Sequence, residues 1–340
     1  MRILLATDAW RPQVNGVVRT LERMTAAAGE WRAEFDFLTP EGFATFPLPT
    51  YPDIRVALAA PWDVGKRIEA SGADHVHIAT EGPIGWSARA YCLERGRLFT
   101  TSYHTRFPEY ISARTPIPED WIYAGLRNFH APAAAVMAPT PSLQGELKSR
   151  GFDNVKVWTR GVDHALYRPQ TADVLDLPRP IFLCVGRVAV EKNLDALLRL
   201  DLPGSVVIVG DGPAREMLAR RYPKAHFLGA RFGEELARIY ASADVFAFPS
   251  RTDTFGIVLI EALASGLPVA AFPVTGPLDV IGDSGAGALS EDLREACLRA
   301  LEIPREKARA HSMKFTWRES ARQFVDHIVT CRAAAGLPVH

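Results

Sequence analysis

Two carboxylates, Asp253 and Glu261, flank the start of a predicted helix in the second half of the chain. Gly256 stands where this helix begins, and apolar residues follow it at helical spacing. The unpaired backbone N–H groups of a first helical turn bind anions, and a glycine lets a ligand approach the backbone. Glu261, further along the helix, can reach hydroxyl groups beside such an anion. The pattern suits a nucleotide-linked sugar, although a glycine-started amphipathic helix with a polar residue is also common without a ligand.

Two cations follow a buried strand upstream of these acids. The apolar run 181–185 is followed directly by Gly186-Arg187, and Lys192 comes shortly before a predicted helix over 194–200. Fixed cations at the end of a parallel strand can neutralise the charge that grows on a departing diphosphate. The alternative interpretation of this segment is a solvated, charged loop.

Two further candidates lie in the first half of the chain. Gly16 opens a helix after the first strand, where a helix N-terminus favours phosphate, although an Asn-Gly pair is often only a turn. His104 follows the strand 98–102 and is predicted to point into a cleft, or to hydrogen-bond within its own loop. His75 and His77 share one strand face without a third metal ligand, so we assign them to structure.

The run Pro249 to Gly266 resembles the E-x7-E signature of retaining glycosyltransferases of the GT-B fold, particularly glycosyltransferase family 4, with Asp253 in place of the usual Glu. The run 186–193 resembles the family's diphosphate-binding motif, and 102–105 resembles the motif whose histidine contacts the donor sugar. Matches of this kind extend from Asp8 to Trp317 and cover nearly the whole chain.

The resemblance implies a catalytic set of four residues. Arg187 and Lys192 stabilise the leaving diphosphate, Asp253 holds the sugar hydroxyls, and His104 holds the sugar near its 6-position. Glu261 holds the ribose, and the loop 227–231 borders the nucleobase. The donor-binding set implied by the resemblance is Gly16, Arg187, Lys192, Leu228, Arg231, Asp253, Phe255, Gly256, Ile257 and Glu261.

The activity implied by the resemblance is a retaining hexosyl transfer (EC 2.4 class) from a UDP- or GDP-linked sugar to an acceptor hydroxyl. No metal and no cofactor other than this donor substrate are expected. Two alternatives stay open: a nucleotide-sugar 2-epimerase of the same fold, which should carry more acidic and histidine residues in its N-terminal cleft, and a non-catalytic sugar-nucleotide binding module, which would lack first-domain residues such as Gly16 and His104. The run Gly210-Asp-Gly212 lacks the third glycine of a dinucleotide fingerprint, which disfavours a nicotinamide enzyme.

The stretch 82–117 resembles family members that glycosylate lipids such as diacylglycerol or phosphatidylinositol. Arginines interleaved with aromatic residues suit an anionic membrane surface, but they also describe an ordinary solvated helix. These residues are Arg89, Arg95, Arg97, Arg106 and Arg114 with Trp86, Tyr91, Tyr103 and Tyr110.

The composition excludes several other classes. Lysine plus arginine equals aspartate plus glutamate, at 39 each in 340 residues, so a nucleic-acid partner is not expected. Four scattered cysteines without a C-x-x-C pair indicate reduced thiols, and no apolar run approaches a membrane span. We expect a cytoplasmic protein that can lie peripherally on the inner face of the cell membrane. Its oligomeric state is not predicted.

Apolar runs alternate with helical patterns, which predicts an α/β protein with parallel sheets. With the resemblance, this gives a GT-B fold of two Rossmann-like domains facing a cleft, with a C-terminal helix crossing back to the first domain. The expected domains are an acceptor-side domain over 1–168, a nucleotide-sugar domain over 169–315 and the helix over 316–340. The strands expected are 3–6, 35–38, 75–78, 98–102, 134–138, 181–185, 206–209, 225–227, 245–247 and 268–271, and the helices expected are 16–28, 86–95, 194–200, 213–220, 233–241, 256–265 and 317 to about 335.

Overall fold

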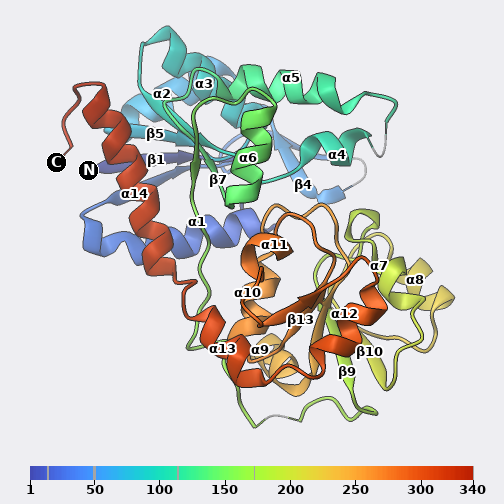
Figure 1. Ribbon diagram of the computed structural model, residues 1–340. Coiled ribbons are helices and arrows are strands. Elements are labelled where there is room, and N and C mark those ends of the chain that lie inside the picture. Colours follow the sequence, from blue (N-terminus) through green and yellow to red (C-terminus); the bar gives the residue numbers. More distant parts are fainter. Residues whose placement is uncertain (14, 49–50, 113–114, 172, 340) are drawn as a thin grey trace. The chain divides into compact units, whose positions relative to one another are not determined.

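The computed structural model describes residues 1–13, 15–48, 51–112, 115–171 and 173–339. It divides into two compact units, Met1–Arg160 with Trp317–His340, and Gly161–Thr316. Each unit is built on a six-stranded sheet in which every pair of neighbouring strands is parallel. Helices cover both sheets (Figure 1), so the predicted pair of Rossmann-like folds is confirmed.

The first unit has the strand order β2-β1-β5-β6-β7-β8 and a separate β3–β4 hairpin. Its strands are β1 (Arg2–Ala6), β2 (Glu34–Leu38), β3 (Thr45–Leu48), β4 (Tyr51–Ala57), β5 (His75–Ile78), β6 (Phe99–Ser102), β7 (Val136–Ala138) and β8 (Val155–Val157). Its helices are α1 (Gly16–Ala27), α2 (Pro61–Ser71), α3 (Pro83–Glu94), α4 (Phe107–Ser112), α5 (Glu119–His130), α6 (Pro141–Ser149) and α14 (Trp317–Ala334), with a 3-10 turn η1 (Ala28–Trp31).

The two histidines of β5 are part of the sheet interior. His75 Nε2 and His77 Nδ1 each lie 2.9 Å from the Thr100 hydroxyl oxygen on the neighbouring strand β6. His77 Nε2 lies 2.8 Å from the Ser102 hydroxyl oxygen. Their predicted structural role is confirmed, because hydrogen bonds to hydroxyl groups let these rings lie in a fully buried strand.

Helix α14 comes last in the sequence but belongs to the first unit, where it lies beside α1 (Figure 1). Phe324 is fully buried, with its ring centroid 4.8 Å from that of Trp158. The Trp158 indole N–H donates to the Ser320 carbonyl oxygen at 3.0 Å, which satisfies the polar atom of a fully buried side chain. The predicted return of the C-terminal helix to the first domain is confirmed.

The second unit has the order β11-β10-β9-β12-β13-β14, which is the strand order of a Rossmann fold. Its strands are β9 (Ile181–Val185), β10 (Ser205–Val209), β11 (His226–Gly229), β12 (Val245–Phe248), β13 (Val269–Ala271) and β14 (Gly287–Leu289). Its helices are α7 (Leu194–Leu198), α8 (Arg215–Arg221), α9 (Gly233–Ser242), α10 (Ile257–Ala264), α11 (Pro277–Val280), α12 (Leu293–Ala300) and α13 (Arg305–Ser312), with a 3-10 turn η2 (Val190–Lys192).

The glycines after β10 have a packing role. A Cβ atom on Gly210 would lie 1.8 Å from the Gly186 carbonyl oxygen, and one on Gly212 would lie 2.5 Å from the Val188 carbonyl oxygen. The Val188 N–H donates to the Asp211 carbonyl oxygen at 2.9 Å. The Gly-x-Gly run therefore holds the loop that carries Arg187 against the end of β10.

The structure contains elements that the sequence patterns did not predict: β3, β4, β8, β14, α2, α4, α5, α6, α11, α12 and α13. The sheet-edge strands β8 and β14 have three residues each, too few to show a pattern. Helix α10 begins at Ile257, one residue after the predicted start, because Gly256 has a left-handed backbone (φ 80°) and precedes the helix as its cap.

Candidate active site

The strand order of the second unit reverses at β9, which has β10 on one side and β12 on the other. Ligands of open parallel sheets bind at the carboxyl ends of the strands at such a reversal. Two loops leave the sheet there, 186–193 after β9 and 249–256 after β12. They carry five of the ten residues predicted for the donor site, namely Arg187, Lys192, Asp253, Phe255 and Gly256.

Lys192 and Asp253 meet across these two loops. Lys192 Nζ lies 2.6 Å from Asp253 Oδ1, and both side chains are largely buried, at 23% and 17% exposure. The Asn193 side-chain amide donates to the Pro249 carbonyl oxygen at 3.1 Å, and the Thr252 hydroxyl donates to the Glu191 carbonyl oxygen at 3.3 Å. The loops are thus joined by three side-chain contacts.

The second carboxylate oxygen of Asp253 has a different environment. Oδ2 is buried, and no hydrogen-bond donor reaches it from the part of the chain that the structure describes. Because buried carboxylate oxygens are nearly always hydrogen-bonded, Oδ2 is placed to accept from a ligand hydroxyl.

The start of α10 offers backbone donors. Its cap residue, Gly256, has no side chain with which to accept from the first N–H groups. The loop before it lies against Gly276, where a Cβ atom would come within 3.2 Å of the Asp253 carbonyl oxygen. The start of α1 differs, because Asn15 Oδ1 accepts from the Val17 and Val18 N–H groups at 3.0 and 3.1 Å.

Glu261 is buried in α10, with 4% of its surface exposed. Its Oε2 accepts a hydrogen bond from the Tyr240 hydroxyl at 3.1 Å, and the Tyr240 ring packs edge-to-face on Tyr167. Sequence reasoning missed Tyr240, which looked like an apolar position of the helix 233–241. A phenol hydroxyl on the buried face of a helix is the signal that could have revealed it.

The remaining donor-site candidates occupy different environments. Arg187 is half-buried directly after Gly186, whereas Leu228 packs against the core from β11, at one edge of the sheet. Arg231 forms an ion pair with Glu235 at 3.1 Å. Phe255 is buried against Phe315, and Ile257 packs against the same core. The structure therefore brings Lys192, Asp253 and Gly256 together on adjacent loops. Arg231 is paired separately, with Glu235 four residues further along the chain.

The strand order of the first unit reverses at β1, where Asp8 follows the strand. Its carboxylate accepts from the Thr80 hydroxyl at 2.9 Å and from the Ile84 and Gly85 N–H groups at 2.8 and 3.2 Å. Burial raises the pKa of Asp8, against the opposing effect of these hydrogen bonds. Asp8 thus caps α3, and Gly16 opens a helix whose first N–H groups are already bound by Asn15.

His104 follows β6 and packs edge-to-face on Trp158, with 5.7 Å between ring centroids. Arg160 Nη2 lies 3.2 Å from His104 Nδ1. Burial, followed by the positive charge of Arg160, holds the pKa of His104 well below its usual value, so the ring is neutral.

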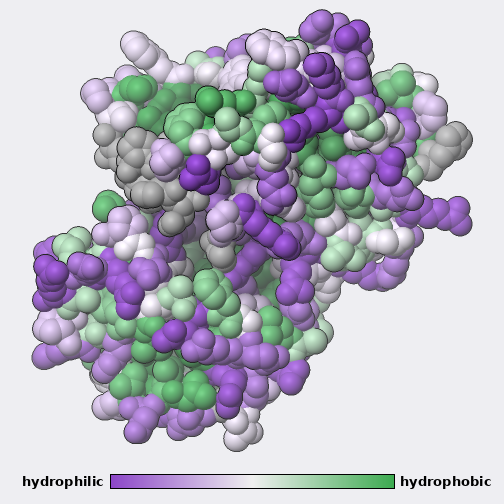
Figure 2. Space-filling view, turned by 180° about the vertical axis from the view of Figure 1, so that it is seen from behind, coloured by the Kyte–Doolittle hydropathy of each residue, from purple (hydrophilic) through white to green (hydrophobic). Residues whose placement is uncertain are grey.

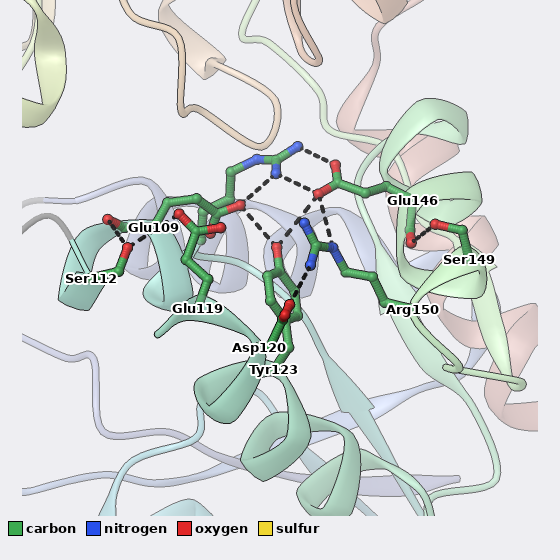
Figure 3. Close-up of polar contacts among 9 residues, drawn as sticks. Glu109, Ser112, Glu119, Asp120, Tyr123, Glu146, Ser149 and Arg150 are labelled. Carbon is green, nitrogen blue, oxygen red and sulfur yellow. Dashed lines mark hydrogen bonds and ion pairs between the residues drawn. The ribbon is translucent and has the colours of Figure 1, made fainter. Parts of the chain in front are cut away.

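A polar network fixes the segment that follows His104. Arg106 Nη1 donates to Glu109 Oε1 at 2.8 Å, and Nη2 donates to Glu146 Oε2 at 2.6 Å. The Tyr123 hydroxyl donates to Glu109 Oε1 at 2.8 Å, and Arg150 lies beside Glu146 (Figure 3). These contacts join α4, α5 and α6. Burial opposes ionisation of Glu146, but the hydrogen bond and charge of Arg106 outweigh it and lower the pKa.

The arginines of the stretch 82–117 are engaged within the first unit. Arg89 donates to the carbonyl oxygens of Phe129 and Asn128, and Arg97 donates to that of Ala73. The side chain of Arg95 lies 3.7 Å from that of Glu69. Arg106 is buried in the network described above. Arg114 lies outside the described residues. Hydrophilic and hydrophobic residues are interspersed on the face shown in Figure 2. The described arginines favour the ordinary-helix interpretation over a basic membrane surface.

The residues that the structure describes contain neither a membrane-spanning helix nor a metal-binding cluster. No helix there is long and apolar enough to cross a bilayer. No group of three or more His, Cys, Asp or Glu side chains lies close enough together in the same residues to hold a metal ion.

Comparison with known families gives matches over both units. Residues 14–166 match the model described as Glycosyltransferase Family 4, and residues 179–302 match Glycosyl transferases group 1. In solved structures, the fold is similar to that of a sucrose-phosphate synthase from Thermosynechococcus elongatus, with a TM-score of 0.80, 20% identity and coverage of 98% of this chain and 99% of the other.

Three curated relatives cover most of the chain. A GDP-mannose-dependent alpha-mannosyltransferase of Mycobacterium tuberculosis is 32% identical over 318 residues, 85% of this chain and 83% of the relative. A sulfoquinovosyl transferase of Arabidopsis thaliana is 29% identical, over 82% of this chain and 60% of its own length. An alpha-monoglucosyldiacylglycerol synthase of Streptococcus pneumoniae is 27% identical, over 88% and 78%. By these matches, the chain belongs to glycosyltransferase family 4 and is a hexosyltransferase of the GT-B fold that uses a nucleoside-diphosphate sugar.

Proposed function

We propose that the protein transfers a hexosyl group from a UDP- or GDP-linked sugar, with retention of configuration, to a hydroxyl group of a membrane lipid such as diacylglycerol or phosphatidylinositol. The observation that carries the donor assignment is the Lys192–Asp253 pair, because it places a cation beside a carboxylate with one buried, unbonded oxygen. A sugar diphosphate has anionic oxygens for the former and hydroxyl groups for the latter.

Each donor group has a proposed partner in the second unit. Lys192 and Arg187 bind the diphosphate together with the N–H groups at the start of α10. Asp253 Oδ2 accepts from a sugar hydroxyl, and Glu261, held by Tyr240, accepts from the ribose. Leu228 and Arg231 border the nucleobase. This assignment is supported by the position of Arg187, Lys192 and Asp253 in loops that follow the carboxyl ends of β9 and β12.

The proposed reaction is a displacement on one face of the sugar. The acceptor oxygen bonds to the anomeric carbon as the bond from that carbon to the phosphate oxygen breaks, and the electron pair stays on the phosphate. The acceptor hydroxyl proton moves to the departing phosphate oxygen. Arg187 and Lys192 stabilise the charge that develops there, which is the largest catalytic contribution expected of such a site.

The lipid acceptor is supported by the name of the relative that is an alpha-monoglucosyldiacylglycerol synthase. We propose that the protein lies peripherally on the inner face of the cell membrane, with Gly16 and His104 on the acceptor side and His104 holding the donor sugar near its 6-position. The domain limits 1–168, 169–315 and 316–340 belong to this proposal.

The experiment is a donor-by-acceptor matrix. Purified protein is incubated with UDP-glucose, UDP-sulfoquinovose or GDP-mannose and with vesicles that contain diacylglycerol, phosphatidylinositol or neither. Mass spectrometry detects the glycolipid, and NMR coupling constants give its anomeric configuration. The control protein is Lys192→Ala.

We expect one donor to give an alpha-linked glycolipid with the wild-type protein only. A beta-linked product would contradict retention, and transfer only to soluble hydroxyl compounds would contradict the lipid acceptor. Release of an epimerised sugar without transfer would favour the 2-epimerase alternative.

A further inference from the structure

Arg160 is the last residue of the first unit before the chain enters the second, and only 3% of its surface is exposed. Nη1 donates to the carbonyl oxygens of Trp158 and Thr159 at 2.5 and 3.2 Å. Its central carbon lies 4.3 Å from the centre of the Trp158 ring. These contacts fix the guanidinium in one position, which leaves Nη2 directed at His104.

In the contact between Arg160 Nη2 and His104 Nδ1, at 3.2 Å, Arg160 must donate and His104 must accept. A guanidinium group carries five N–H donors and no acceptor, so the imidazole nitrogen must supply the lone pair. A neutral imidazole with an acceptor at Nδ1 carries its single proton at Nε2.

We propose that Arg160 is a positioning residue that fixes His104 in the Nε2–H tautomer, so that His104 acts as a hydrogen-bond donor and not as a base. Trp158 completes the arrangement, since the His104 ring packs on it at 72° and the Arg160 guanidinium lies over its ring. The role of Arg160 does not require that it touch the substrate.

Electrostatics supports the same assignment. Burial and the adjacent guanidinium lower the pKa of His104, so the doubly protonated ring is disfavoured. A charged neighbour that can only donate also disfavours the tautomer with a proton on Nδ1, because two N–H groups would then face each other.

The consequence for transfer rests on the proposed function. A donor at Nε2 can hydrogen-bond a hydroxyl oxygen of the donor sugar, whereas the other tautomer would present a lone pair there. We therefore expect Arg160 to affect turnover more than it affects nucleotide affinity, because the nucleotide contacts lie in the second unit.

The test reads the tautomer directly. Protein labelled with ¹⁵N-histidine is studied by long-range ¹H–¹⁵N correlation NMR at neutral pH, and the His104 signals are assigned with His104→Gln. Arg160→Met removes the donor and Arg160→Lys keeps a charged donor without the planar fork. Arg127→Met is the matched control, because the Arg127 side chain belongs to the same unit and donates to the Arg150 carbonyl oxygen at the surface.

In the wild-type protein, we expect the His104 Nδ1 shift of an unprotonated nitrogen. Arg160→Met should move it toward the protonated range and lower kcat about tenfold, the effect of one lost hydrogen bond, while nucleoside diphosphate affinity stays unchanged. Arg160→Lys should keep the tautomer and most of the activity.

A protonated Nδ1 in the wild-type protein would overturn the proposal, and that measurement needs no variant. An unchanged His104 spectrum in Arg160→Met would overturn it even if activity fell, because the role of Arg160 would then be structural only. Since the spectrum is independent of donor and acceptor, these outcomes are separate from a failure of the proposed lipid transfer.

Discussion

Lys192 Nζ and Asp253 Oδ1 are 2.6 Å apart on loops that leave the neighbouring strands β9 and β12. Asp253 therefore fixes the direction of the Lys192 ammonium group, the cation that we assign to the diphosphate. Preorganised charge of this kind does not have to be reoriented during the reaction. Because the two side chains are in contact, a substitution of either one also removes a contact of the other.

Removing a cation should reduce turnover. We expect Arg187→Ala and Lys192→Ala to lower kcat by about two to three orders of magnitude, the scale for loss of one preorganised charge contact. The measurement is initial rate at saturating donor, with circular dichroism to verify folding. Lys224→Ala is the matched control, because Lys224 is exposed in the same unit. Near-normal turnover in both site variants would contradict the diphosphate assignment.

Substitutions of Glu261 and Asp253 should have different effects on nucleotide binding. Glu261→Gln should weaken both the nucleoside diphosphate and the intact donor, because Glu261 is assigned to the ribose. Asp253→Asn should preserve diphosphate affinity, since Lys192 loses a competing partner, but should lower transfer. Calorimetric titration with UDP and GDP measures both. Equal losses of diphosphate affinity would show that the two roles are divided wrongly.

Tyr240 should affect nucleotide binding because it holds Glu261. Tyr240→Phe removes the hydroxyl that donates to Glu261 Oε2, and we expect nucleoside diphosphate affinity to fall about fivefold, corresponding to ~1 kcal/mol for one hydrogen bond. Tyr222→Phe is the matched control, because its hydroxyl bonds to Asp195 elsewhere in the unit. Comparable affinity losses in both variants would point to a general effect on the fold.

Transfer should not require a divalent cation. In the proposed donor site, the side-chain cations Arg187 and Lys192 are assigned the role that a metal ion has in other sugar-nucleotide sites. Activity after dialysis against excess EDTA should equal that of untreated protein. Loss of activity with rescue by Mn²⁺ or Mg²⁺ would count against the assignment of these two residues.

Stability of the first unit should fall in acid. Burial lowers the pKa of His75 to about 3 and that of His77 well below 6.5. Below pH 6.5 the unfolded chain therefore binds protons that the folded chain does not, and the free energy of unfolding falls as pH falls, by up to ~1.4 kcal/mol per pH unit for each group. All seven tryptophans lie in this unit, so tryptophan fluorescence during urea unfolding reports on it.

The matched variant is His75→Gln. It should reduce the slope of unfolding free energy against pH between pH 6 and 4, whatever its effect on stability at pH 7. A slope equal to that of the wild-type protein would contradict the contribution of this buried ring.

Motifs with their own chemistry were visible in the sequence, but their partners were not. Lys192 and Asp253 could be named because charge and spacing mark them, yet their contact depends on β12 pairing with β9, which lies far away in the chain. Buried runs such as 181–185 predicted strands correctly, whereas the three-residue edge strand β14 carries no such pattern. Tyr240 acts only through Glu261, so its hydroxyl on the buried face of a helix indicates that it needs a partner but not which residue that partner is.

The position of α14 has a consequence for protein synthesis. The first unit needs α14 to cover the cluster around Leu21 and Phe324, so this surface stays open to solvent on the ribosome until residues 317–334 emerge. The second unit is complete in the chain before that point, a reversal of the usual order in which N-terminal domains fold first. Trp158, on which His104 rests, gains its bond to Ser320 only then. We therefore expect a chain that stops before residue 317 to fold its second unit while Trp158, and with it the packing of His104, lacks the support of α14.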